Sequence, residues 1–217
     1  FNSGLNIPNY IYHIGDSTNA KFGYSGNGTF IFQVDSSNIL LANATGLAVT
    51  GTVTGTSFNG IPFFTDTTNN SMYTHDVSGT DDTAQNNTAY GFNSLQSITS
   101  GDNNTTIGRN AGTSLSVGNN NAILGAFAGD DLTTGHNNVA VGFSALATET
   151  ITGRVIAVGY NALANQRSDS HTYNVGVGYE AGKQITTGNL NTLIGGFAGD
   201  AITEGHSNVA VGYQALS

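Results

Sequence analysis

The chain has 217 residues and a net charge of −9 at pH 7, and its 5 lysine and arginine residues form no basic patch. Nucleic acids and anionic membrane surfaces are bound through clusters of such residues, so we expect neither as a partner. Cysteine is absent, which excludes disulfides and cysteine-ligated metals. The longest apolar runs, at 39–42 and 61–64, are too short to insert across a membrane.

Residues 1–60 contain short apolar runs separated by Gly, Asn, Asp and Ser, which is the pattern of β-strands joined by turns. These runs lie at 10–14, 21–24, 29–34 and 38–42. Segment 46–60 then alternates valine with threonine or glycine and has no matching run within the chain. We therefore predict an N-terminal fibre or shaft region over residues 1–60, whose β-strands intertwine with those of other chains.

Residues 61–85 combine a short apolar run with a longer polar stretch and show no repeat. The segment directly precedes the first repeat, and the end of a stacked repeat array needs a cover over its core. We predict a connector or a cap over residues 61–85.

A repeat of 17 residues fills the rest of the chain, residues 86–217, and we number its positions from the start of an Asn-x-x-x-Gly motif. The copies begin at Asn87, Asn104, Asn121, Asn138, Val155, Asn174, Asn191 and Asn208. The fifth copy is two residues longer than the others, and its insertion lies between Gln166 and Tyr173. Because the last copy stops early and no Met begins the chain, we expect the sequence to be a piece of a longer protein.

Three columns of the repeat predict structural roles. Position 5 is always glycine, which indicates a turn or a close backbone contact that a side chain would prevent. The predicted turn glycines are Gly91, Gly108, Gly125, Gly142, Gly159, Gly178, Gly195 and Gly212. Position 4 is always apolar, and we predict that it fills the interior of the coil as a core column. That column comprises Ile107, Leu124, Val141, Val158, Val177, Ile194 and Val211. Position 3 is mostly small, so we expect a neighbouring chain to approach that face closely.

The period of the repeat decides the fold class. Seventeen residues are too few for a pair of helices, and they fit one solenoid coil with two short strands and two turns. Asn at position 1 would form a hydrogen-bonded ladder along the stack. Leu and Gly alternate at position 9, where large residues of one coil would fill space left by the next. The predicted fold is an all-β, parallel β-solenoid of about eight coils.

The run Asn-x-Ala-Val-Gly-Tyr-x-Ala-Leu, with its Thr-Thr-Gly turns, resembles repeats of bacteriophage tail-fibre proteins over residues 87–217. It is similar also to the head repeats of trimeric autotransporter adhesins, which are left-handed parallel β-rolls. The resemblance implies left-handed coils, a homotrimer, and a rigid virion structural protein that holds or forms a host-attachment surface. It places the protein on the virion, in a tail fibre, or on an extracellular surface. Coil length differs from that of the adhesin heads, so the phage fibre is favoured and the adhesin head is the alternative.

The sequence offers no convincing catalytic or metal site. His136 and His206 both occupy position 16, but four coils separate them, so we interpret them as turn residues rather than ligands of one ion. Glu149, Glu180 and Glu204 are isolated from one another, whereas a glycan-cleaving site needs two carboxylates about 5–10 Å apart. We therefore predict a protein that is not an enzyme and that uses no cofactor.

The insertion of the fifth copy is the candidate for surface recognition of a host cell-surface glycan or protein. Its candidate residues are Arg167, Asp169, His171 and Tyr173. A further alternative is an ice-binding solenoid, because position 13 forms a Ser/Thr column. Its neighbour, position 14, mixes Ser, Val, Thr, Ile and Glu, which argues against a flat ice-binding face.

Overall fold

A computed structural model describes residues 71–74, 83–151, 153–168 and 170–217, and before them the backbone of six short strands. The chain divides into two compact units, Phe1–Gly55 and Thr56–Ser217. Asp169, one of the predicted recognition residues, lies outside the described residues.

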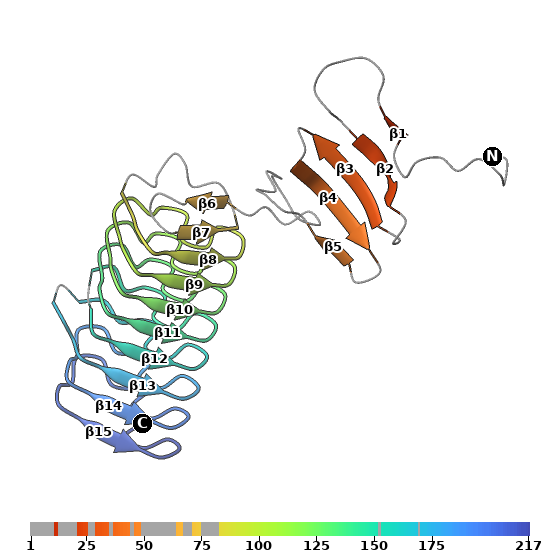
Figure 1. The fold of residues 1–217 in the computed structure, drawn as a ribbon. Helices are drawn as coiled ribbons and strands as arrows, with labels where there is room; N and C mark the ends of the chain where they lie inside the picture. The colour runs from red at the N-terminus through yellow and green to blue at the C-terminus, as the bar shows by residue number, and fades with distance from the viewer. Residues whose placement is uncertain are drawn as a thin grey trace. The chain divides into compact units, whose positions relative to one another are not determined.

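The first unit contains a five-stranded antiparallel sheet in which each strand pairs with the next along the chain (Figure 1). Its strands are β1 (Ile11–Tyr12), β2 (Lys21–Ser25), β3 (Thr29–Val34), β4 (Ser37–Asn43) and β5 (Gly46–Ala48). The pairing of β3 with β4 shifts register between Phe32 and Gln33. β5 pairs with β4 of its own chain, so this start of segment 46–60 has a partner within the chain. Residues 49–60 lie outside the described ones, and their pairing with other chains stays a prediction.

The second unit is a β-solenoid built on a ten-stranded sheet (Figure 1). It opens with an antiparallel pair, β6 (Phe64–Asp66) and β7 (Ser71–Tyr73). β7 then pairs in parallel with β8, and each later strand pairs in parallel with the one before it. These strands are β8 (Thr88–Tyr90), β9 (Thr105–Ile107), β10 (Ala122–Leu124), β11 (Val139–Val141), β12 (Ile156–Val158), β13 (Val175–Val177), β14 (Thr192–Ile194) and β15 (Val209–Val211). The parallel β-solenoid predicted from the period is confirmed.

Each coil contains one strand, at positions 2–4, and not the two that we predicted. The remaining positions run through turns, as the loops between successive strands in Figure 1 show. The reason is the backbone conformation. Positions 5, 7, 9 and 17 carry positive φ angles, as at Gly108 (136°), Asn110 (55°), Gly112 (58°) and Asn120 (59°). A strand needs negative φ throughout, so none can form over positions 5–9. Among the described residues, positions 10–16 carry no positive φ, and there the chain runs through turns and bends without a second strand.

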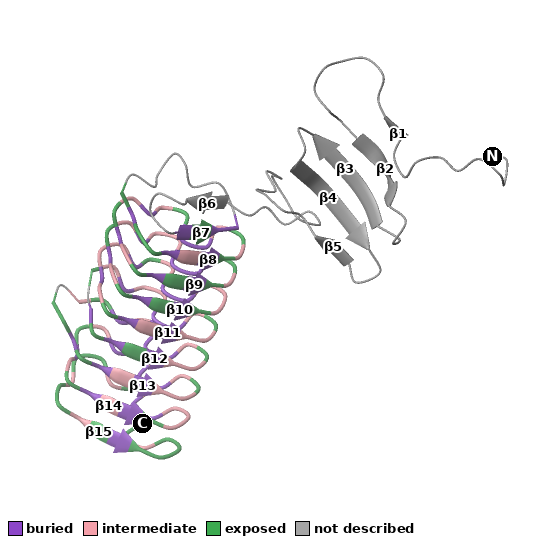
Figure 2. Cartoon of the chain, viewed as in Figure 1, coloured by how far each residue is buried: buried purple, intermediate pink, exposed green. Residues whose placement is uncertain are grey.

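The interior of the coil is lined by position 3 of each strand, by positions 8 and 12, and by the position-9 leucines of coils 1, 4 and 5; each coil has a buried inner side in Figure 2. Ala140, Ala145, Leu146 and Leu132 are all fully buried examples. The prediction that position 4 forms the core column is wrong for the single chain. Ile107, Leu124, Ile194 and Val211 are 39–66% exposed, and Val141, Val158 and Val177 are half-buried. The narrow coil accepts the smaller side chains of position 3, and strand alternation then turns positions 2 and 4 outward.

Positions 3 and 9 compensate each other in size within a coil. Alanine at position 3 is accompanied by leucine at position 9, as in Ala140 and Leu146, whereas Ile123 is accompanied by Gly129. A Cβ added to Gly129 would lie 3.1 Å from the Cδ1 of Ile123, so the larger residue already occupies that space. Coil 6 has glycine at both positions, and there the neighbouring coils fill the space: a Cβ added to Gly182 would lie 2.7 Å from side-chain atoms of both Leu163 and Leu193. The alternation of Leu and Gly at position 9 therefore reflects packing inside most coils and, at coil 6, the predicted interlocking between coils.

Candidate functional site

The position-5 glycines stack so closely that no side chain fits between them. Their φ angles lie between 127° and 140°, a region that favours glycine. A Cβ placed on Gly142 would lie 2.4 Å from the carbonyl oxygen of Gly159 in the next coil, and six of the other seven meet similar contacts. These glycines hold the coils in register at the end of every strand.

The asparagines of position 1 form a buried ladder. The backbone N–H of Asn121 donates to Oδ1 of Asn104 over 3.0 Å, and its Nδ2 donates to the same oxygen and to the carbonyl of Gly135. Equivalent contacts join Asn87 to Asn104, Asn174 to Asn191, and Asn191 to Asn208. Because each amide binds both the neighbouring coil and the turn of its own coil, the ladder fixes the coil spacing.

The ladder is interrupted in the fifth coil, where Val155 replaces asparagine. Gln166, from position 12, takes over its role: Gln166 Oε1 accepts from Nδ2 of Asn174 at 2.8 Å. Gln166 Nε2 donates to Glu149 Oε2 at 3.1 Å and to the Thr172 hydroxyl at 3.0 Å. All four of these polar side chains are fully buried. The network replaces both the missing asparagine and the apolar residues that position 12 has in other coils.

The carboxylate of Glu149 also accepts hydrogen bonds from backbone N–H groups that have no backbone acceptor among the described residues of the next coil. At position 13 the N–H normally donates to the carbonyl of the next coil, as from Thr133 to Thr150 over 2.7 Å and from Arg167 to Thr186 over 2.8 Å. The N–H groups of Thr150 and Ile151 instead donate to Oε1 of Glu149, at 2.9 and 3.3 Å. Sequence reasoning missed Glu149 and Gln166, although both break the apolar column of position 12.

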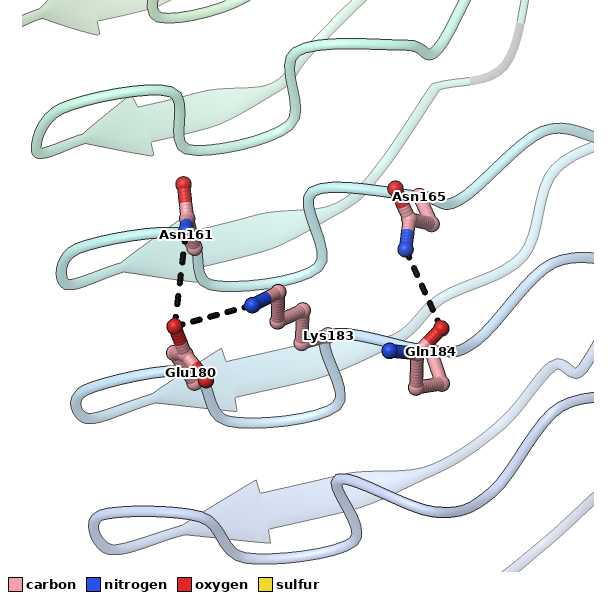
Figure 3. A network of polar contacts seen from close by, with 5 residues as sticks. All are labelled: Asn161, Asn165, Glu180, Lys183 and Gln184. Carbon is pink, nitrogen blue, oxygen red and sulfur yellow. Dashed lines mark hydrogen bonds and ion pairs between the residues drawn. The ribbon is translucent and has the colours of Figure 1, made fainter.

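Beside the insertion lies a surface cluster of polar side chains that links coils 5 and 6 (Figure 3). Glu180 Oε1 accepts from Lys183 Nζ at 2.9 Å and from Asn161 Nδ2 at 3.5 Å, while Asn165 Nδ2 donates to Gln184 Oε1 at 3.2 Å. The hydrogen bond from Lys183 holds the pKa of the Glu180 carboxyl below its usual value and raises the pKa of Lys183. Because both side chains are partly exposed to solvent, the pair adds little to stability. It does mean that the charge of Lys183 is already neutralised by Glu180.

The predicted recognition residues separate into two groups. His171 and Tyr173 are exposed, with ring centroids 6.4 Å apart, and the guanidinium of Arg154 lies 5.7 Å from the Tyr173 ring. Arg167 is exposed elsewhere, on an open groove of about 360 Å³. The groove is lined by Thr148, Asn165, Arg167, Thr186 and Thr187.

A second surface feature runs along the strands. We call the outward side chains at positions 2 and 4 of β8–β15 the sheet face. It contains no charged residue, and Leu124, Ile156 and Val209 are among its exposed members, at 47%, 41% and 74%. Position 4 is apolar in all eight coils and position 2 in five of them, with threonine in the other three, so the described part of the chain presents a mainly apolar surface along the strands.

Aromatic rings continue this apolar surface on the turns that follow β10 to β15. Successive rings have centroids 5.1–5.9 Å apart, and the guanidinium of Arg109 lies 5.2 Å from the first ring. The six rings are Phe127, Phe143, Tyr160, Tyr179, Phe197 and Tyr213. The ring of Tyr160 is stacked between those of Phe143 and Tyr179, with interplanar angles of 11° and 7°. Both faces of the Tyr160 ring are therefore already in contact with another ring.

The two histidines of position 16 have a structural role. Nδ1 of His136 accepts from the N–H of Asn119 at 3.0 Å, and Nδ1 of His206 accepts from the N–H of Asn189 at 3.3 Å. Asn119 is the position-16 residue of coil 2, and its Oδ1 likewise accepts a hydrogen bond from the backbone N–H of Asp102 in coil 1. Asn, Asp and His share this position because each has an acceptor two bonds from Cβ. Among the described residues, no group of three or more His, Asp or Glu side chains could hold a metal ion.

No protein-family model matches the chain, and no curated protein and no solved structure is significantly similar to it. Within the described residues, no helix is long and apolar enough to cross a membrane.

Proposed function

We propose that the chain is a structural segment of a virion tail fibre: a rigid homotrimeric rod that spaces or presents a host-attachment surface. The observation that carries the proposal is the sheet face. Monomeric proteins rarely leave a continuous apolar patch of more than a few hundred Å² exposed, and larger ones mark contacts with a partner. Eight coils at about 4.8 Å each extend this face over roughly 40 Å.

A second copy of the chain is the partner that fits this surface best. The side chains of the sheet face recur once per coil, so only a partner with the same spacing can match all of them. Another copy has that spacing by construction. The number three comes from the resemblance of residues 87–217 to tail-fibre repeats, and so does the location on a virion.

The glycine and asparagine columns support a mechanical role. Every coil is tied to the next by strand pairing, by stacked glycines and, in most coils, by the asparagine ladder. A rod built in this way resists bending and local opening, because any separation of two coils breaks several contacts at once. No enzymatic role is included in the proposal, since the sequence pairs no carboxylates as a hydrolase would require.

The native mass of the purified chain, measured by light scattering without denaturant, tests the proposal. We expect about three times 22.3 kDa, the mass of one chain. A monomer with the same circular-dichroism spectrum would overturn the trimeric rod, since the sheet face would then be stable in water.

Two alternatives carry less support. The hydroxyls of Thr99, Ser116 and Thr133 donate to the carbonyl of position 13 in the next coil, so these donors are not available to an ice lattice. The adhesin head of the trimeric autotransporter type would share the apolar sheet face. A membrane-anchoring domain encoded after this segment in the full-length gene would decide for the adhesin.

A further inference from the structure

The groove beside Arg167 is a consequence of the irregular fifth coil. Its lining residues come from position 11 of coils 4 and 5 and from positions 13 and 14 of coils 5 and 6. Between coils 4 and 5 the backbone contact at position 13 is replaced by hydrogen bonds to the buried carboxylate of Glu149. The hollow therefore occurs where the repeat is interrupted, and its size of about 360 Å³ falls within the range of small-molecule sites.

The groove offers one cation. Three of the five lysine and arginine residues of the chain lie between residues 154 and 183. Of these, Lys183 is paired with Glu180, and Arg154 is placed over the ring of Tyr173. Within the part of the chain that the structure describes, no carboxylate lies at ion-pair distance from Arg167. Its planar guanidinium presents two parallel N–H donors, the geometry that a carboxylate binds.

Two of the other lining groups, the hydroxyls of Thr148 and Thr186, can act only as acceptors toward a ligand. The hydroxyl of Thr148 donates to the carbonyl of Ala164 at 2.9 Å, and that of Thr186 donates to the carbonyl of Thr203 at 3.2 Å. Since each hydroxyl has a single donor, both oxygens face a ligand only as acceptors. Asn165 uses one N–H for Gln184 and keeps its second N–H as a donor and its Oδ1 as an acceptor. A ligand must therefore bring its own hydroxyl donors to this part of the groove.

We propose that this groove binds a carboxylated sugar, with the carboxylate on Arg167 and ring hydroxyls donating to Thr148, Thr186 and Asn165. Inorganic phosphate fits poorly, because a dianion would face several acceptors and only one cation. A neutral sugar would leave the guanidinium without its anion. The inference rests on the proposed attachment role, for which it names the class of ligand on the presented surface.

The groove stays accessible in the proposed assembly. Its residues occupy positions 11 to 14, about half a circuit of the coil from the strand at positions 2–4. Copies that associate through the sheet face would leave this side of each coil in water. A fibre of three chains would then present three equivalent grooves at the height of the fifth coil, which increases avidity for a polysaccharide.

Saturation-transfer-difference NMR on the full chain tests the proposal with glucuronate, galacturonate and N-acetylneuraminate as probes, and with glucose and acetate as controls. We expect saturable binding of at least one carboxylated sugar in the millimolar range or tighter, and binding at least about tenfold weaker for glucose and for acetate. Arg167→Gln should weaken the sugar by about tenfold or more, because it removes a charge-assisted pair. Arg154→Gln, a second exposed arginine outside the groove, should leave the affinity unchanged.

The proposal is overturned if none of the three sugars saturates, or if Arg167→Gln binds as tightly as the parent chain. Light scattering on the same samples separates this outcome from a failure of the proposed fibre. A trimer that binds no sugar overturns the groove alone. A monomer that binds through Arg167 overturns the trimeric rod and leaves the groove intact.

Discussion

At the scale of single residues, the position-5 glycines are the least replaceable part of the chain. We predict that Gly142→Ala lowers the free energy of unfolding by about 3 kcal/mol or more. Its φ of 130° is a conformation that costs other residues on the order of 1–3 kcal/mol, and the new Cβ would meet the Gly159 oxygen at 2.4 Å. The midpoint of thermal unfolding, followed by circular dichroism, measures the loss.

The matched control is Gly196→Ala, which lies one position further along its coil. The nearest atom to its added Cβ is a ring carbon of Tyr213 at 3.5 Å, an ordinary contact distance. We expect a change within about 0.5 kcal/mol. Equal melting temperatures for both alanine variants would show that the stacked glycines do not determine coil register.

The pairing of positions 3 and 9 also acts at the level of residues, through volume. Coil 4 combines Ala140 with Leu146, and coil 3 combines Ile123 with Gly129. We predict that Ala140→Ile and Leu146→Gly each destabilise the chain, by about 1–3 kcal/mol from overpacking and by about 2–5 kcal/mol from the cavity. The double variant should recover most of the loss, because it recreates the pair of coil 3. Additive losses in chemical denaturation of all three variants would contradict this reading.

At the scale of the element, the sequence predicted the coil and mispredicted its orientation. The invariant glycines and the Asn column fixed the period of the repeat, and the parallel stack follows from it. The apolar column of position 4 indicated the core because large aliphatic residues are usually buried. Large aliphatic residues stay outside when the coil interior is too narrow for them, and they can then be exposed on a face that a second chain would cover. Position 3 is alanine or glycine in five of the eight coils, and a narrow interior selects such small residues; Ile123 and Leu193 fit there because position 9 of their coils is glycine.

The fifth coil shows what a column analysis of the sequence leaves out. The insertion was visible, and so was the loss of asparagine at Val155. The compensation by Glu149 and Gln166 depends on side chains that reach from position 12 toward two different coils. Such contacts follow from coordinates and not from the spacing of residue types. The same holds for the groove, whose lining residues come from three successive coils.

We predict that Glu149→Gln destabilises the solenoid by about 1–3 kcal/mol. Whichever way the new amide points, its NH₂ group faces either the N–H groups of Thr150 and Ile151 or the Nε2 of Gln166. A buried donor would then lack an acceptor. Glu204→Gln, the same substitution at an exposed site, should change stability by less than about 0.5 kcal/mol. Hydrogen exchange at the Thr150 amide gives the local measurement, and unchanged protection there would refute the role of Glu149.

At the scale of the whole molecule, we expect the exposed apolar surface to make the stability of the solenoid depend on association with further copies. Small solenoid coils bury little apolar area each, and here much of the apolar surface stays outside. A surface of this kind gains free energy by association, at roughly 25 cal/mol for each Å² removed from water. Assembly and folding of the described coils should therefore be coupled, with stability that depends on chain concentration.

A single charge on the sheet face tests that coupling. We predict that Val141→Lys shifts the native mass from a trimer to a monomer and lowers the thermal midpoint, because an ammonium group buried between apolar faces loses its hydration without gaining a partner. Val141 lies at position 4 of the central coils, where strand alternation turns the side chain outward, so the substitution leaves the interior of the coil unchanged. Gln184→Lys, at an exposed position 11, introduces the same charge on the turns and should leave the mass as it is. If Val141→Lys keeps the mass of the parent chain and its thermal midpoint, copies do not meet through the sheet face. The row of aromatic rings on the adjoining turns would then be the next surface at which to introduce a lysine. The first position would be Tyr160, which is stacked between two other rings and is still 42% exposed.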